Sequence, residues 1–209
     1  MDLRALAIES GFGTDYHTPY GDWAIKLRAD GVPRVTGAQG KLVLVSAMSP
    51  SPTGEGKTTT TIGLTDALRL RGERAIAALR EPSMGPVFGA KGGGTGGGKA
   101  TIEPAQRINL HFTGDFHALT AAHNLIAAVV DNHLHFRSEL GLLAKRVVWP
   151  RVLDVNDRAL RNIAIGMGGT GDGAMRQASF EITAASELMA ILALAKDGVR
   201  VTGVEQDAA

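Results

Sequence analysis

A lysine and a threonine follow a glycine-bearing turn in the order that a phosphate-binding loop uses. The stretch from Ser51 to Thr58 reads SPTGEGKT and matches the pattern G-x-x-x-x-G-K-[ST], except that Ser51 replaces the first glycine. In such a loop backbone N–H groups surround the nucleotide phosphates, Lys57 reaches the outer phosphates, and the Thr58 hydroxyl ligates magnesium. The predicted nucleotide-binding residues are Ser51, Pro52, Thr53, Gly54, Glu55, Gly56, Lys57 and Thr58.

The segments on both sides of this loop are those that the motif requires. Leu42 to Val45 is a short apolar run typical of a strand, and Thr58 to Arg71 has the pattern of a helix that stops at Gly72. The N-terminal end of that helix would direct its partial positive charge at the same phosphates. A strand-to-helix turn without a ligand is the alternative, and the flanking strand and helix favour the phosphate loop.

Arg80 and Glu81 follow a second apolar segment, Arg74 to Leu79, which we expect to be a buried strand. Ligands of a doubly wound sheet bind outside the carboxyl ends of its strands, so both side chains would emerge beside the phosphates. An arginine there can stabilise a transferring phosphoryl group or bind a carboxylate, and a glutamate can help to hold magnesium. A surface Arg–Glu pair at a strand end is the alternative.

Two later stretches are further candidates for the same cleft. Residues 91–99 read KGGGTGGGK, which is either a flexible linker or a loop that closes over an anion with Lys91 and Lys99 at its rim. Ile108 to Phe112 is a strand candidate, and a long helix follows it. His111 and His117 flank this turn, so we expect them to make polar contacts in a cleft.

Histidine is concentrated between positions 111 and 135, where five of the six histidines lie. Their spacing matches no zinc motif, because there is no H-E-x-x-H and no pair four residues apart on one helix face. His123 falls on the apolar stripe of the long helix, so we expect a core histidine.

The part of the chain after the long helix offers weaker signals. Arg146 to Leu153 predicts a strand, and Asp154 after it is a candidate for orienting magnesium. Capping of the next helix by Asn156 or Asp157 is the alternative, and Thr183 can cap the final helix.

Length and composition favour one α/β domain. We predict a P-loop NTPase-like, doubly wound, mostly parallel sheet with helices on both faces at residues 41–196, an N-terminal arm at 1–40 and a polar tail at 197–209. The formal charge of +1 gives nucleic-acid binding no electrostatic support. The chain has no cysteine and no apolar run near the ~20 residues of a membrane-spanning helix. We therefore expect a cytoplasmic protein with no membrane or nucleic-acid partner.

Five blocks of the chain resemble the formate–tetrahydrofolate ligase family, in that family's order. They are PTGEGKTTTTIG at 52–63, LREPSMGPVFG at 79–89, NLHFTGDFHA at 109–118, VNDRALRN at 155–162 and ASELMAIL at 185–192. The similarity is near-continuous from Tyr20 to Lys196. The family also lacks glycine at the position of Ser51, so this departure from the phosphate-loop pattern agrees with the resemblance.

The resemblance implies an ATP-driven ligation in one-carbon metabolism. Formate attacks the outer phosphate of ATP to give formyl phosphate, and the amine of tetrahydrofolate then attacks this acyl phosphate to give formyltetrahydrofolate. Lys57 would neutralise charge on the transferring group, Arg80 would bind formate and then formyl phosphate, and Glu81 is the third candidate catalytic residue. Further family motif positions, with possible substrate contacts, are His111, Thr113, Asp115 and His117. The resemblance also implies that magnesium binds with the nucleotide and that a monovalent cation takes part.

Members of this family are well over twice as long, and their remaining part carries much of the folate pocket. Three functions therefore stay open. The first is the complete ligase, with ATP, formate and tetrahydrofolate as substrates. The second is a catalytically incomplete nucleotide-binding fragment, or half of a split ligase whose folate site a homo-oligomer or second chain completes. The third is another P-loop kinase or ATPase, which formate dependence of ATP turnover would distinguish from the first.

Overall fold

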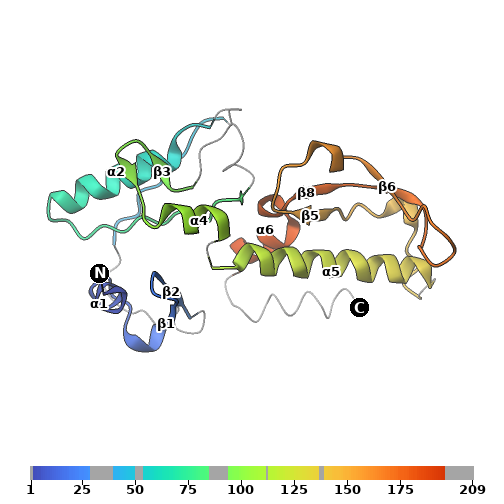
Figure 1. The fold of residues 1–209 in the computed structure, drawn as a ribbon, viewed down its shortest axis with the longest axis horizontal. Coiled ribbons are helices and arrows are strands. Elements are labelled where there is room, and N and C mark those ends of the chain that lie inside the picture. Colours follow the sequence, from blue (N-terminus) through green and yellow to red (C-terminus); the bar gives the residue numbers. More distant parts are fainter. Residues whose placement is uncertain are drawn as a thin grey trace. The chain divides into compact units, whose positions relative to one another are not determined.

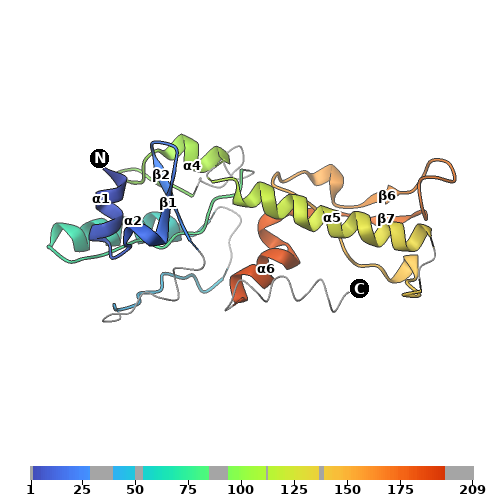
Figure 2. The same ribbon diagram turned by 90° about the horizontal axis from the view of Figure 1, so that it is seen from below.

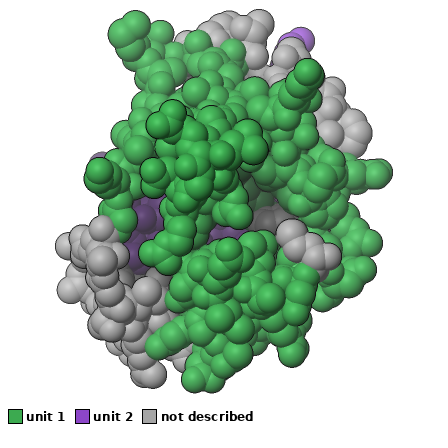
Figure 3. All heavy atoms as spheres, turned by 90° about the vertical axis from the view of Figure 1, so that its left-hand side faces the viewer, with its two compact units in different colours: residues 1–113, 196–209 green, residues 114–195 purple. Residues whose placement is uncertain are grey.

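The computed structural model describes residues 2–28, 40–49, 54–84, 94–111, 113–136 and 139–195. The chain forms two compact units, one of residues 1–113 and 196–209 and the other of residues 114–195. Figure 1 follows the chain as a ribbon, and Figure 3 colours the atoms of the first unit green. Both units combine helices with short strands, which confirms the predicted α/β class. The predicted domain limits after residues 40 and 196 adjoin residues outside the described ranges and stay predictions.

The first unit begins with a short helix and an antiparallel hairpin. Helix α1 (Leu3–Glu9) is capped by Asp2, whose carboxylate accepts hydrogen bonds from the backbone of the first turn. The 3-10 helix η1 (Thr14–Tyr16) leads into β1 (His17–Tyr20), which pairs with β2 (Ala24–Leu27). The turn of this hairpin reaches α4 (Ala105–His111), because Arg107 lies over the Trp23 ring at 5.5 Å and 3.1 Å from the Asp22 carboxylate.

Helix α2 (Lys57–Leu70) confirms the helix predicted after the phosphate loop. Its Ile62 is buried, and the small hairpin of β3 (Gly96–Gly97) and β4 (Ala100–Thr101) lies against it (Figure 1). The contact is close at Gly96, where a Cβ would stand 2.8 Å from the Ile62 Cδ1. The absence of side chains on the glycines therefore allows the hairpin to approach the helix.

The segment predicted as a strand at Ile108 to Phe112 is helical up to His111, so that prediction is wrong. A short apolar run does not by itself distinguish a strand from a helix. Here Pro104 precedes the run, and the Ile108 N–H donates to the Pro104 carbonyl at 3.1 Å. Helix α4 therefore begins at Ala105, directly after this proline.

The predicted strands at residues 42–45 and 74–79 have no regular secondary structure. Leu42 is 93% exposed and Ile76 64% exposed, so neither segment is buried. Among the residues that the structure describes, the strands form four two-stranded sheets, β1–β2, β3–β4, β5–β8 and β6–β7. The described residues thus do not assemble the doubly wound sheet.

The second unit is organised along α5 (Asp115–His135), which confirms the predicted long helix. Strand β5 (Arg151–Leu153) pairs in parallel with β8 (Phe180–Ile182), and β6 (Ile163–Ile165) pairs antiparallel with β7 (Arg176–Ala178). Figure 1 shows β5, β6 and β8 on one side of α5, and β6 and β7 are seen beside this helix in Figure 2. The remaining elements are η3 (Ala144–Arg146), η4 (Arg158–Leu160), η5 (Thr183–Ala185) and α6 (Glu187–Leu194). The buried core includes Phe116, Ala127 and Val152.

Two predictions for the second unit need correction. The strand predicted from Arg146 is limited to Arg151–Leu153. Thr183 does not cap the final helix, because its hydroxyl lies 2.7 Å from the Thr120 hydroxyl inside the unit. Ser186 caps α6 instead, with its Oγ accepting a hydrogen bond from the Met189 N–H at 3.1 Å.

Candidate functional site

The described part of the predicted nucleotide loop consists of Gly54, Glu55 and Gly56. Ser51, Pro52 and Thr53 lie outside the described residues. Gly54 and Gly56 have φ angles of 83° and 69°, in the left-handed region that favours glycine. A Cβ at either glycine would meet nothing within 4 Å in the described parts of the chain, so the loop backbone is open to a ligand on that side.

Lys57 and Thr58 lie in the first turn of α2, directly after this loop. Side chains cap α1 and α6, whereas within the described ranges no side chain caps α2 or α5. The first N–H groups of a helix have no intrahelical acceptor, and they bind anions such as phosphate. Lys57 is exposed and Thr58 half-buried, so an ammonium and a hydroxyl group lie in the first turn of this helix. Nucleotide binding by these residues stays a prediction.

Arg80 and Glu81 are followed by Pro82, which contacts the glycine-rich hairpin. A Cβ on Gly94 would lie 2.5 Å from the Pro82 Cβ, and a Cβ on Gly96 would lie 2.8 Å from the Ile62 Cδ1 of α2. The hairpin therefore touches both the nucleotide-loop helix and the segment that carries Arg80. Arg80 is exposed and Glu81 half-buried.

The linker interpretation of residues 91–99 is wrong for the part that the structure describes. Gly96 and Gly97 pair with Thr101 and Ala100 in the hairpin, and Gly94 and Gly96 lie too close to Pro82 and Ile62 to leave room for a Cβ. Lys91 lies outside the described residues, and Lys99 is exposed. Closure of this loop over an anion stays a prediction.

The four candidate substrate contacts come from the turn between α4 and α5. Thr113 is buried, and Gly114, with a φ of 83°, is the N-cap of α5, which begins with Asp115. The division between the units falls after Thr113, so His111 and Thr113 belong to the first unit, and Asp115 and His117 to the second. The side chain of His111 lies outside the described residues. Their meeting in one cleft stays a prediction.

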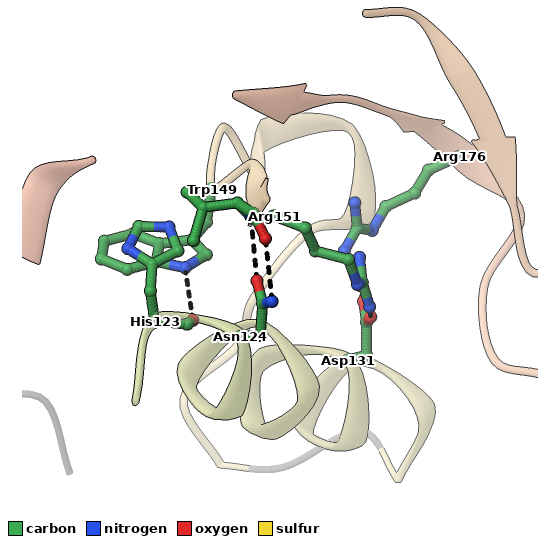
Figure 4. Close-up of polar contacts among 7 residues, drawn as sticks. His123, Asn124, Asp131, Trp149, Arg151 and Arg176 are labelled. Atoms are coloured by element: carbon green, nitrogen blue, oxygen red, sulfur yellow. Dashed lines mark hydrogen bonds and ion pairs between the residues drawn. The ribbon is translucent and has the colours of Figure 1, made fainter. Parts of the chain in front are cut away.

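His123 is a core residue, as predicted from its place on the apolar stripe. Its side chain is fully buried, and its ring stacks on Trp149 with centroids 4.4 Å apart (Figure 4). The Nε2 atom lies 3.0 Å from the Pro150 carbonyl. The carbonyl can only accept, so Nε2 carries the proton of this contact.

The segment after β5 supports the capping interpretation for Asp157. Its Oδ1 accepts a hydrogen bond from the Ala159 N–H at 2.9 Å and so caps η4. Asp154 is half-buried, and its predicted role towards magnesium stays a prediction. In the described ranges, no group of three or more His, Asp or Glu side chains could hold a metal ion.

The family model of formate–tetrahydrofolate ligase matches residues 1–201. The chain belongs to this family. Formate–tetrahydrofolate ligase of Myxococcus xanthus is 55% identical over 199 residues, which are 94% of this chain and 36% of that protein. The ligase of Beijerinckia indica is 63% identical over 157 residues, 75% of this chain and 28% of its own length. The ligase of Sphingobium is 54% identical over 198 residues, which are 94% of this chain and 36% of that protein.

This member of the formate–tetrahydrofolate ligase family spans about a third of the length of these relatives. Its PTGEGKTTTTIG and LREPSMGPVFG blocks both belong to the first unit, where the glycine-rich hairpin joins them. Its VNDRALRN and ASELMAIL blocks belong to the second unit. None of the helices in the described ranges combines the length and apolarity that crossing a membrane requires.

Sequence reasoning missed Thr95 and Asn109, which hold the hairpin to α4. The Asn109 Nδ2 donates to the Thr95 Oγ1 at 3.0 Å. The available signal was weak: Thr95 is the one residue with a side chain inside the run GGGTGGG, and Asn109 opens the block NLHFTGDFHA.

Proposed function

We propose that this chain takes part in the ATP-dependent ligation of formate to tetrahydrofolate through formyl phosphate, which gives formyltetrahydrofolate and ADP. The observation that carries this proposal is the position of Lys57 and Thr58. They occupy the first turn of a helix that starts from a left-handed glycine and has no side-chain cap in the described ranges. Family membership supplies the reaction class.

Residues of this chain take part in each step of the proposed reaction. A formate oxygen attacks the terminal phosphorus of ATP, the bond to the bridging oxygen breaks, and ADP leaves. The Lys57 ammonium and the first N–H groups of α2 stabilise the charge on the phosphate oxygens. The planar guanidinium of Arg80 binds formate in two-point fashion and then holds formyl phosphate, while the folate amine attacks the formyl carbon and phosphate leaves.

Magnesium would enter with the nucleotide and neutralise part of the phosphate charge. The Thr58 hydroxyl at the start of α2 and the Glu81 carboxylate are oxygen donors of the kind that magnesium prefers. Their places, in the helix turn that follows the loop and beside Arg80, fit this role. The monovalent cation of the proposal is assigned to no residue.

We also propose that residues 41–196 form a P-loop NTPase-like domain with a doubly wound, mostly parallel sheet. The support is the parallel β5–β8 pair and a two-residue alternation of exposure along residues 74–80. In that segment Ala75, Ala77 and Leu79 are half-buried, while the residues between them are exposed. The proposal places the protein in the cytoplasm, and a homo-oligomer or second chain completes the folate site.

ADP release by the 209-residue chain with MgATP, with and without formate and tetrahydrofolate, tests this function. We expect turnover that needs formate, and a loss of about 10²–10³-fold in Lys57→Ala because a preorganised charge on the phosphoryl group is removed. Lys41→Ala is the matched control, since Lys41 is another exposed lysine before the loop. Equal rates for Lys57→Ala and the unchanged chain would contradict the assignment.

A nucleotide-binding module that needs a further chain for ligation is the second candidate. The observation in its favour is that the relatives are about three times as long as the matched region. MgATP binding that Lys57→Ala abolishes, without formate-dependent turnover, would support it. ADP release that formate does not change would instead indicate another P-loop kinase or ATPase.

A further inference from the structure

Thr95 is fixed at both its backbone and its side chain. Its Oγ1 accepts a hydrogen bond from the Asn109 Nδ2 of α4 at 3.0 Å, and its carbonyl accepts one from the Ile102 N–H at 3.1 Å. Thr95 is 5% exposed, so water does not compete freely for these groups. The glycine-rich hairpin is thereby held to α4 at one defined residue.

Close contacts flank Thr95 on both sides. Before it, Gly94 approaches Pro82 so tightly that a Cβ would stand 2.5 Å from the ring. After it, Gly96 approaches the Ala100 carbonyl and the Ile62 side chain of α2, leaving no room for a Cβ. Any displacement of Thr95 therefore changes the contact with Pro82, the contact with α2, or both.

The Thr95–Asn109 pair places a polar amide at a part-buried position. The Asn109 Oδ1 is buried and has no hydrogen-bond partner among the described residues. A buried acceptor without a donor costs stability, whereas two apolar side chains of similar shape would avoid this cost. Local departures from the most stable choice tend to occur where function imposes a geometry.

We propose that Asn109 and Thr95 are positioning residues that set the spacing between α2 and the Arg80–Glu81 segment. Neither touches a reacting group; they act through the glycines that meet Ile62 and Pro82. The proposal deepens the proposed function and rests on it for its catalytic consequence, because α2 carries the nucleotide and Arg80 the formyl group. Phosphoryl transfer depends on such spacing, and a small misplacement of the two partners costs as much as about 10²-fold in rate.

The spacing itself can be measured without any turnover. The chain has no cysteine, so Asp66→Cys on α2 and Ala78→Cys beside Arg80, both at exposed positions, introduce two specific sites for spin labels. In this doubly labelled chain we expect one narrow distance distribution from pulsed electron paramagnetic resonance. Thr95→Val and Asn109→Ala should each broaden or shift it, whereas Thr95→Ser, which keeps the hydroxyl, should leave it narrow.

The catalytic consequence is read from formate-dependent ADP release in the unlabelled variants. We expect a loss of about 10-fold or more in Thr95→Val and in Asn109→Ala, with the Kd for MgATP nearly unchanged. The thermal unfolding temperature should fall in both variants, because each breaks a part-buried hydrogen bond. The double variant should lose no more than either single one, because the two residues form one contact. Rescue by Thr95→Ser distinguishes the hydrogen bond from side-chain size.

Unchanged distance distributions in both variants would overturn the proposal, as would altered spacing together with unaltered formate-dependent turnover. Equal loss of MgATP affinity and turnover would also overturn it, because that result indicates a general structural role. If the unchanged chain shows no formate-dependent turnover, the proposed function fails for this chain, and the distance measurement alone decides the spacing claim.

Discussion

Helices α2 and α5 begin alike and are fixed in opposite ways. Each starts after a left-handed glycine, Gly56 or Gly114. Along α2, the hydroxyls of Thr61 and Thr65 bond to the helix's own backbone, and the tight contact to another element is made through glycine. Along α5, polar side chains bond to residues distant in sequence, from Thr120, Asn124 and Asp131.

Asn124 and Asp131 show what α5 contributes to the second unit (Figure 4). Asn124 accepts a hydrogen bond from the Val152 N–H at 2.9 Å and donates one to the Val152 carbonyl at 3.0 Å, as a neighbouring strand would. Asp131 binds both Arg151, at 2.5 Å, and Arg176. The polar residues of α5 thus stabilise the fold.

Lys57 of α2, by contrast, is exposed, as is Arg80 in the same unit. Substitutions in the two helices should therefore have different effects. Replacing the polar residues of α5 should lower the free energy of unfolding. Replacing residues at the start of α2 should lower turnover with little effect on folding.

Removal of the Asp131 carboxylate should have the largest effect on stability. The side chain of Arg176 is 5% exposed, and its Nε and the Arg151 Nη1 are buried with no partner in the described parts of the chain. Asp131→Asn leaves two guanidinium groups without their shared counter-charge. We expect a loss of about 2–4 kcal/mol in the free energy of unfolding, measured in urea.

Asp66→Asn is the matched control for this substitution, because Asp66 is exposed on α2. It should change the free energy of unfolding by less than about 0.5 kcal/mol. Similar changes in the two variants would break the contrast between the helices.

Replacement of Asn124 should rank second. Asn124→Ala leaves the N–H and the carbonyl of the fully buried Val152 without their partners, which costs about 1–3 kcal/mol. Asn132→Ala is the control on the same helix, because Asn132 is exposed and its substitution removes the same amide group. The difference between the two variants in urea unfolding gives the contribution of the Asn124 hydrogen bonds to Val152 of β5. Equal urea midpoints would show that these bonds do not add to the free energy of unfolding.

The helices at the nucleotide loop and at Asp115 could be predicted because their signals are local: a glycine start and an apolar period within one segment. The segments at 42–45 and 74–79 could not be settled in this way, because a strand depends on a neighbour that is distant in sequence. The Thr183 prediction failed for the same reason, since the partner of its hydroxyl, Thr120, lies 63 positions earlier.

Within the candidate site, the motif predicted the helix start that carries Lys57 and Thr58, but not the contact between Thr95 and Asn109. Lys57 and Thr58 are where the phosphate-loop pattern predicts them, after left-handed glycines. The pair of Thr95 and Asn109 is a contact between two unrelated segments. A lone threonine among glycines carries no sequence period that would indicate it.

The smallest effect is expected at the ion pair of Asp22 and Arg107, which has the same chemistry as the Asp131 pairs but lies at an exposed place. The hydrogen bond from Arg107 lowers the pKa of the Asp22 carboxyl below its ordinary value, and the charge of Arg107 adds to this. The folded pKa is thus below the unfolded one. Its stabilisation is fully present above the ordinary pKa of about 4 and is lost as pH falls through the folded pKa.

Asp22→Asn should therefore lower the Tm slightly at neutral pH and at low salt, and the difference should vanish in acid. It should also shrink at 1 M salt, because ions screen an exposed pair. Asp131→Asn should keep most of its effect at the same salt concentration, since Asp131 and its arginines are largely buried. Thermal unfolding of both variants across pH and salt measures this; an equal salt response would mean that burial does not separate the two pairs.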